Sequence, residues 1–229
     1  MYPFKLPNSY YHICCGFSHG WLATVDKSHA ITLLYPFKNV APISLPTLEF
    51  DYRSYTSLSE VGYKVTLSAD PITRPNDYIV VAIHTSIYER FAFIKAGEPC
   101  WTYVRSWTRH LSFMDVMFYG GLVYVASKYH GIVFFNLDYL DDEETLIPIQ
   151  DIAFHGSFKG YLVKSLEGDL WIVKFFFTFK GDFQVYKLEF DAETGKFKQM
   201  LKLESLGDNV CYWETLIQFL YQLHTSLVV

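Results

Sequence analysis

The feature that most constrains the fold is a recurring segment in which two apolar runs flank a short polar turn. It occurs as GWLATVDKSHAITLLYPF, as GLVYVASKYHGIVFFNLD and as GYLVKSLEGDLWIVKFFF. A spacing of eleven residues recurs in the three: Gly20 to Ile31, Gly121 to Ile132 and Gly160 to Trp171. DYIVVAIHTSIYERFAFI keeps both runs but joins them by a longer connection. Alternation with a period of two predicts β-strands, so we expect each segment to be a hairpin.

One more strand candidate follows each hairpin: APISL, CWTYVR, TLIPI and KFKQML. Repeats of this size, with four short strands each, are typical of β-propeller blades. Neighbouring blades cover each other's faces, which explains apolar residues on both sides of the strands. We therefore predict an all-β, propeller-like fold of four-stranded blades, about four of them, over residues 1–209. We expect the ring of blades to be incomplete.

The pattern changes over residues 210–229, which we treat as a divergent C-terminal segment. The apolar residues of WETLIQFLYQLH fall at helical spacing: Trp213, Leu216, Ile217, Leu220 and Leu223. This segment predicts a short amphipathic helix. It either docks on an exposed propeller edge or forms an unpacked tail that promotes aggregation.

GFSHG, residues 16–20, fits the G-x-S-x-G pattern of the nucleophile elbow of serine hydrolases. An elbow needs a strand before the serine and a helix after it. The residues that follow, WLATV, alternate with a period of two, so a strand and not a helix is expected there. We interpret Gly16 and Gly20 as residues that shape a blade turn, with Ser18 bonding locally to the backbone.

His12, Cys14, Cys15 and His19 lie close together but do not have the spacing of a zinc finger. Cys100 and Cys211 are isolated and supply no second pair of ligands. We expect no metal and no other cofactor. The adjacent Cys14 and Cys15 would form a strained disulfide, so free thiols are predicted.

Charge and composition limit the classes of partner and the cell compartment that we expect for this chain. The net charge is −5, and no segment concentrates the basic residues, which argues against a nucleic-acid partner. MYPFKLPNSYYHICC lacks the features of a signal peptide, and no apolar run is long enough for a membrane span. Four cysteines in this length suit reduced thiols. We expect a cytoplasmic or nuclear protein without membrane contact.

Propeller enzymes often carry carboxylates at the central channel. The candidates here are Asp26, Asp70, Asp115 and Asp169, each of which could equally cap a turn. No nucleophile–base pair or phosphate loop accompanies them, so we predict that the chain is not an enzyme.

Three groups of residues carry a resemblance to a known family. The opening group is Ser18–Leu22, Tyr35–Phe37 and Leu45–Pro46, with tyrosine at position 35 where asparagine is common in that family. The middle group is Asp115–Val116, Gly121, Tyr124 and Gly131, with a tryptophan before them at 101 or 107. The last group is GYLVKSLEGDLWIVKFFF, FQVYKLEF and LESLGD. In this order the residues resemble the plant F-box-associated β-propeller family, the KIB-type, kelch-like propeller of F-box proteins, and the similarity runs from about residue 14 to 209.

The resemblance implies a protein-interaction module, the half of a ubiquitin ligase substrate receptor that recognises the substrate. The upstream F-box that binds the ligase adaptor is not found in this sequence, so direct adaptor binding is not expected. The alternatives are a non-functional truncated product of a larger F-box gene and, less favoured, a propeller enzyme. Aromatic residues in loops are the candidate contacts for an unknown protein partner: Tyr52, Tyr55, Trp107 and Tyr129.

Overall fold

The computed structural model describes residues 12–49, 62–84, 90–104, 113–127, 131–137, 147–148, 158–176, 183–191 and 197–206. The regular elements in these ranges are strands: β1 (Ile13–Ser18), β2 (Trp21–Val25), β3 (Ala30–Leu34), β4 (Ile43–Thr47), β5 (Tyr63–Leu67), β6 (Ile79–His84), β7 (Arg90–Lys95), β8 (Thr102–Val104), β9 (Phe113–Tyr119), β10 (Leu122–Ser127), β11 (Gly131–Phe135), β12 (Ile147–Pro148), β13 (Phe158–Lys164), β14 (Leu170–Phe176), β15 (Phe183–Phe190) and β16 (Phe197–Lys202). None of the described residues forms a helix of a length and apolarity that could span a bilayer.

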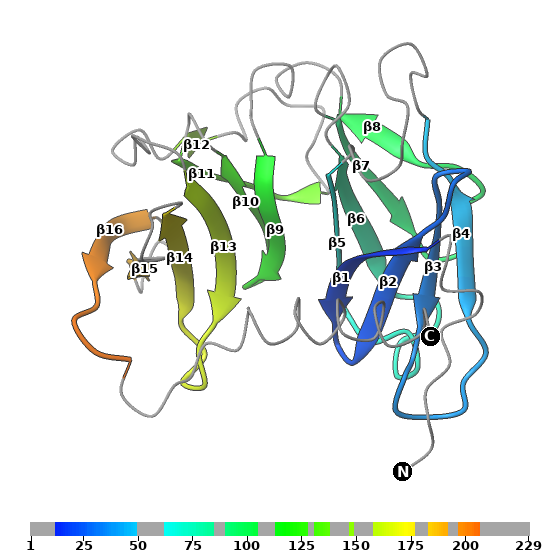
Figure 1. Ribbon diagram of the computed structural model, residues 1–229, viewed down its shortest axis with the longest axis horizontal. Helices are drawn as coiled ribbons and strands as arrows, with labels where there is room; N and C mark the ends of the chain where they lie inside the picture. The colour runs from blue at the N-terminus through cyan, green and yellow to red at the C-terminus, as the bar shows by residue number, and fades with distance from the viewer. Residues whose placement is uncertain are drawn as a thin grey trace, which may run out of the picture.

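The strands form four antiparallel sheets, each built from four strands that follow one another along the chain (Figure 1). We call them blades 1 to 4, from β1–β4 to β13–β16. The first strands of successive blades lie next to each other: β1 contacts β5, β5 contacts β9, and β9 contacts β13. This arrangement confirms the prediction of an all-β propeller with four-stranded blades.

The ring of blades is not closed. Figure 1 shows β1–β4 and β13–β16 at opposite sides of the molecule, with blades 2 and 3 between them. Among the described strands, β13 makes no contact with β1 comparable to those that join neighbouring blades. The predicted incompleteness is therefore confirmed. The predicted helix in residues 210–229 lies outside the described residues, as does the domain boundary at 209.

Adjacent blades pack face to face, and the second strand of each blade shows how the sequence achieves this. Val80 and Ala82 of β6 belong to the core shared with blade 1, whereas Val81 and Ile83 belong to the core shared with blade 3. Successive side chains of a strand point to opposite faces. A continuous apolar run is thus what a strand buried on both faces requires.

The same division recurs in the next blade. Val123 and Val125 of β10 pack toward blade 2, and Tyr124 and Ala126 pack toward blade 4. Each fully buried valine contributes roughly 1.5–3 kcal/mol through the hydrophobic effect. Blade packing is therefore the main source of stability.

One predicted equivalence is wrong. The segments that begin at Gly20 and Gly121 form the second and third strands of their blades, β2–β3 and β10–β11. The segment from Gly160 to Trp171 instead joins β13 to β14, the first and second strands. Every hairpin of a meander has two apolar strands and a polar turn, so an eleven-residue spacing does not identify which hairpin it is.

The GFSHG motif is a hairpin, as expected, but two of its residues act differently from the prediction. His19 and Gly20 form the turn between β1 and β2, with positive φ angles of 52° and 82°. Gly16 lies in β1, not in the turn, and a Cβ atom at this position would come within 2.0 Å of the Val65 carbonyl oxygen in β5. Ser18 donates to the Leu67 carbonyl at 3.3 Å, which is a contact with the next blade and not a local one.

Gly16→Ala should therefore lower the free energy of unfolding by about 3 kcal/mol or more, because the methyl group meets backbone that cannot move aside. Gly160→Ala is the matched control, since its Cβ would meet the flexible end of Met114, 2.9 Å from Cε. That control should change stability by less than about 1 kcal/mol. Urea unfolding of both variants tests the difference. Equal losses of stability in the two variants would show that the packing of β1 against β5 does not require glycine at position 16.

Candidate functional site

The first strands of the four blades line a cavity of about 1690 Å³. We call this cavity the channel. Its wall includes residues of each first strand, such as Cys14 of β1, Lys64 of β5, Asp115 of β9 and Tyr161 of β13. The first strands can line one cavity together because they contact one another in sequence order.

Asp115 is the polar centre of the channel wall. Its carboxylate lies 3.7 Å from the Lys64 ammonium of blade 2 and accepts a hydrogen bond of 2.8 Å from the Leu162 backbone of blade 4. Asp115 itself belongs to β9 of blade 3, so one side chain joins three blades. Burial raises the pKa of Asp115, although Lys64 and the backbone N–H groups of Leu162 and Val116 act in the opposite direction.

Two neighbours complete this part of the wall. The Lys64 ammonium lies 5.1 Å from the centre of the Tyr161 ring, a cation–π contact with blade 4. Burial raises the pKa of the Cys14 thiol, even though a backbone hydrogen bond and Lys64 favour the thiolate. Cys14 is therefore a neutral thiol at pH 7 and a weak nucleophile.

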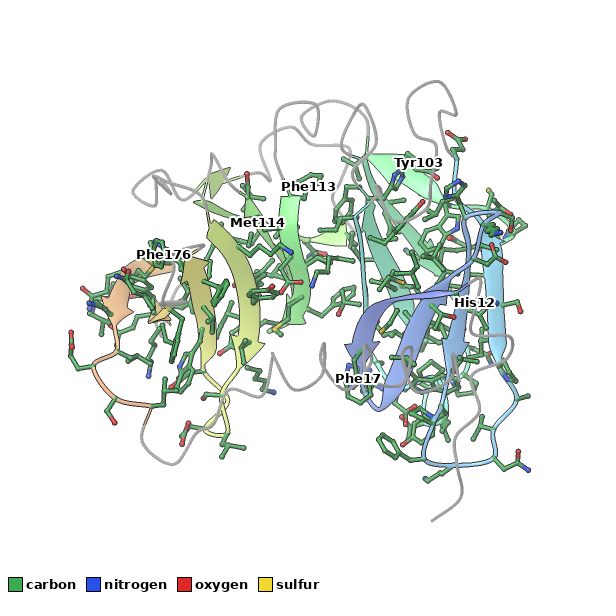
Figure 2. The ribbon with its side chains drawn as sticks, in the orientation of Figure 1. His12, Phe17, Tyr103, Phe113, Met114 and Phe176 are labelled. Carbon is green, nitrogen blue, oxygen red and sulfur yellow. The ribbon has the colours of Figure 1, made fainter. Side chains whose placement is uncertain are left out.

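A second candidate surface lies where the first strands end. Figure 2 places Phe17 at the lower end of β1. The turn between β1 and β2 is at this end, and so are the β3–β4, β5–β6 and β13–β14 connections, because the strands of each blade alternate in direction (Figure 1). We call these connections, together with Phe17, the lower rim.

Large apolar side chains are exposed on the lower rim. The exposed fractions are 47% for Phe17, 73% for Phe37, 39% for Ile72 and 80% for Leu166. Phe17 and Phe37 belong to blade 1, Ile72 to blade 2 and Leu166 to blade 4. Residues that are far apart in the sequence therefore lie at the same end of the molecule. The other exposed large apolar residues in the described ranges are Ile13, Phe183 and Leu201, which lie on strands.

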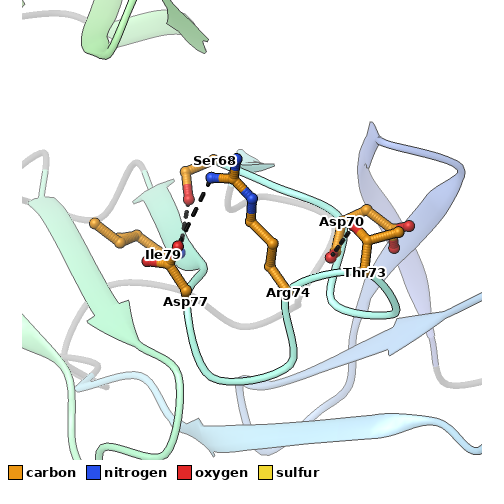
Figure 3. A network of polar contacts seen from close by, with 6 residues as sticks. All are labelled: Ser68, Asp70, Thr73, Arg74, Asp77 and Ile79. Atoms are coloured by element: carbon orange, nitrogen blue, oxygen red, sulfur yellow. Dashed lines mark hydrogen bonds and ion pairs between the residues drawn. The ribbon is translucent and has the colours of Figure 1, made fainter.

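The β5–β6 loop of the lower rim, residues 68–78, is held in one conformation by its own hydrogen bonds. Asp70 accepts at one carboxylate oxygen from the Ile72 N–H and from the Trp21 indole of blade 1, both at 2.9 Å. The Asp70 carbonyl accepts from the backbone of Thr73 and Arg74. Arg74 and Asp77 form an ion pair at 3.7 Å (Figure 3). The loop thus presents Ile72 in a fixed position.

The predicted carboxylates do not converge. Asp26 accepts from Ser28 and Ala30 in the β2–β3 turn, Asp70 caps its own loop, and Asp169 pairs with Lys187 at 2.7 Å. Turn capping was one of the two predicted roles, but Asp115 does not follow it because it lies within β9. In the described ranges, no group of histidine, cysteine, aspartate or glutamate residues could hold a metal ion. Cys14, Cys15 and Cys100 are free thiols.

The predicted partner contacts, Tyr52, Tyr55, Trp107 and Tyr129, lie outside the described residues and stay predictions. The contacts predicted from the sequence do not include Phe17, Phe37, Ile72 or Leu166. Leu166 could have been found, because an apolar residue in the turn SLEGD has no hairpin role. Phe17 could not, because it reads as an ordinary strand residue.

Comparison with known proteins identifies the family. A family model described as the KIB1-4 beta-propeller matches residues 1–220. The chain belongs to the KIB1-4 β-propeller family. This confirms the resemblance inferred from the sequence. No curated protein matches this KIB1-4 propeller.

Among solved structures, a chain described as "YCF48 bound to D1 peptide" aligns with a TM-score of 0.42 and 7% sequence identity. The alignment covers 83% of the KIB1-4 propeller and 53% of the solved chain, so this protein spans about half the length of that one. The family model, and not this distant similarity, identifies the fold.

The contribution of Asp115 to the free energy of unfolding should depend on pH. Asparagine and alanine at this position distinguish the effect of its charge from the effect of its hydrogen bond to Leu162. Because its pKa is raised in the folded state, the protonated form favours folding below the usual carboxyl pKa of about 3.9, and this advantage is lost as the pH rises through the folded-state pKa. Asp115→Asn keeps an acceptor for Leu162 and cannot ionise. Its stability relative to the original protein should therefore increase as the pH rises above about 4.

Asp115→Ala leaves the Leu162 N–H without this acceptor and should cost about 1–3 kcal/mol near pH 4. Because alanine cannot ionise either, this cost should shrink as the pH rises, in parallel with the change in the asparagine variant. Urea unfolding between pH 4 and 8 measures both effects. A constant difference between the asparagine variant and the original protein would show that the carboxylate is as well stabilised in the channel as in water.

Asp70→Ala should loosen the β5–β6 loop, because the Ile72 N–H and the Trp21 indole lose their shared acceptor. We expect hydrogen exchange at Thr73 and Arg74 to become about tenfold faster, which corresponds to about 1.4 kcal/mol of lost hydrogen bonding. Asp70→Asn retains an acceptor oxygen and is the control. Unchanged exchange in the alanine variant would mean that backbone bonds alone hold the loop.

Proposed function

We propose that the protein is a protein-recognition module whose contact surface is the lower rim. The observation that carries this proposal is the set of exposed apolar side chains there, Phe17, Phe37, Ile72 and Leu166. Loops held by a rigid scaffold are common binding surfaces, and large apolar side chains supply much of the binding energy at protein interfaces.

The geometry of the rim supports recognition of a protein and not of a small molecule. The exposed side chains come from blades 1, 2 and 4, so a ligand that touches all of them must extend across the channel mouth. The Asp70 bonds fix the β5–β6 loop before a partner binds. Binding then costs less conformational entropy than it would for a mobile loop.

The family resemblance supports a finer proposal. The partner is a substrate protein, and recognition leads to its ubiquitylation, as in F-box proteins whose propeller presents the substrate to the ligase. This role requires an adaptor-binding partner or segment in addition to the blades described here. It also places the protein in the cytoplasm or the nucleus. We propose no catalytic reaction for the chain itself.

The proposal is tested by substituting the rim and comparing captured proteins. Phe37→Ser with Leu166→Ser removes two rim side chains that are 73% and 80% exposed, so the fold should be unaffected. Phe183→Ser with Leu201→Ser is the matched control away from the rim, at 50% and 39% exposure. Quantitative mass spectrometry of affinity-purified complexes should show specific proteins that the rim variant loses and the control retains.

Equal partner lists for the original protein and both variants would overturn the assignment of the rim. The ubiquitin-ligase role has its own readout. Proteins that depend on the rim should accumulate and carry less ubiquitin in cells that express the rim variant in place of the original protein. Unchanged ubiquitylation of such proteins would leave a recognition module without a ligase role.

A further inference from the structure

We infer that the apolar side of residues 213–223 covers the outer face of blade 4, where a closed propeller would have a further blade. We call the side of blade 4 that packs on blade 3 its inner face and the opposite side its outer face. The outer face is formed by one cluster of apolar side chains: Tyr161, Val163, Trp171, Val173, Val185, Leu203 and Leu206. This inference goes beyond the proposed function and does not depend on it, because it concerns a contact within the chain.

The centre of the outer face is almost as well buried as the inner face. The exposed fraction is 5% for Trp171 and 0% for Val173, compared with 0% for both Leu170 and Ile172 of the inner face. The inner face is buried because residues of blade 3 pack against it. Within the described ranges, the cluster of the outer face contains only residues of blade 4 and of the chain directly after β16. A sheet face with nothing packed on it stays in contact with water, so the cover comes from residues outside those ranges.

The chemistry of the outer face calls for an apolar cover. Val173 and Val185 present only hydrocarbon to whatever packs on them, and polar groups buried against them would lose their hydrogen bonds to water. The indole N–H of Trp171 is buried and has no acceptor in the part of the chain that the structure describes. An apolar helix surface fits such a face, because the carbonyl groups of a helix are bonded within the helix itself.

The chain reaches the outer face as it leaves the last strand. Leu203 and Leu206, which follow β16, pack against the cluster. Residues 207–209 are GDN, and each of these residue types favours a turn. A turn at this point directs the following residues back over the face that Leu203 and Leu206 adjoin. Residues 213–223 are therefore close enough in the chain to cover it.

The other undescribed segments are less suited to this role. Residues 177–182 and 192–196 are short connections between neighbouring strands of blade 4. Residues 138–146 and 149–157 adjoin β12, which belongs to blade 3 on the inner side. Residues 1–11 precede β1, which lies at the opposite side of the molecule from blade 4 (Figure 1).

The size and pattern of the segment match the face. Eleven helical residues, 213–223, are about 16 Å long at about 1.5 Å per residue. The four strands of blade 4 are about 14 Å wide, at about 4.8 Å between neighbouring strands. Glu214, Gln218 and Gln222 fall on the side of the helix opposite the apolar residues. Such a helix crosses the whole sheet and gives the end of the blade array a polar outer surface, as terminal caps of repeat proteins do.

Photo-crosslinking in the full chain tests the contact directly. A photoreactive benzophenone side chain replaces Leu220 on the apolar side or, as the matched control, Gln218 on the polar side. The protein is irradiated at low concentration, and mass spectrometry identifies the attached peptides. We expect position 220 to attach to β14 or β15 of the same chain, at least about tenfold more often than position 218. Attachment of position 220 to other blades, or equal attachment from both positions, would overturn the inference. Attachment between two chains would overturn it in favour of a second copy as the cover.

A second measurement follows the burial of Trp171. Leu216→Ser with Leu220→Ser removes apolar contacts of the cap, and Glu214→Ser with Gln218→Ser is the matched control on its polar side. Hydroxyl-radical labelling of Trp171 should become at least about tenfold faster in the first variant and stay unchanged in the second. Trp21, which is 1% exposed in the core between blades 1 and 2, should stay slow to label in both and so reports that the blades remain folded. Unchanged labelling of Trp171 in the first variant would show that another segment covers blade 4.

Discussion

The burial of both faces of each sheet against neighbouring sheets is the constraint on which this structure depends. A blade of four short strands has too little apolar surface on its own, so its stability comes from the next blade. Ile83 and Phe91 of blade 2 pack with Val123 and Val125 of blade 3, and similar clusters join blades 1 and 2 and blades 3 and 4. Every other feature follows from this stacking: the arc of blades, the channel and the rim.

Stacking brings the first strands so close together that polar groups become part of the packing. Asp115 is the clearest case, because it bonds the backbone of blade 4 and pairs with Lys64 of blade 2. Removing a carboxylate from water is unfavourable, and the surrounding donors offset part of that cost. Between blades 1 and 2 the Ser18 hydroxyl and the Trp101 indole donate to the carbonyls of Leu67 and Pro46, and the Trp21 indole donates to the Asp70 carboxylate. The contacts of Asp115 and Ser18 lie in the channel wall, whereas the Trp101 contact joins the outer strands of blades 1 and 2.

Much of the fold could be predicted from the sequence, because its signals are local. Continuous apolar runs such as IVVAI and LVYVA indicate strands that are covered on both faces, and they are β6 and β10. The site was less predictable. Phe17 and Leu166 lie more than a hundred residues apart, and nothing in the sequence states that the ends of β1 and β13 share one rim. The predicted partner contacts are aromatic residues of expected loops, and a sequence does not show where in the molecule those loops lie.

The strands, the hairpins, the family and the burial of each sheet on both faces could be predicted from the sequence alone. These depend on the alternation of side chains along a strand and on residues close in the chain. Packing between blades, in contrast, places Gly160 within the first strand of blade 4, where it does not repeat the role of Gly20, and brings Gly16 against the Val65 carbonyl. It also decided that Asp115 joins three blades. The physical reason is that these roles depend on which strand of a neighbouring blade lies opposite, and this is set by packing between segments that are distant in the sequence.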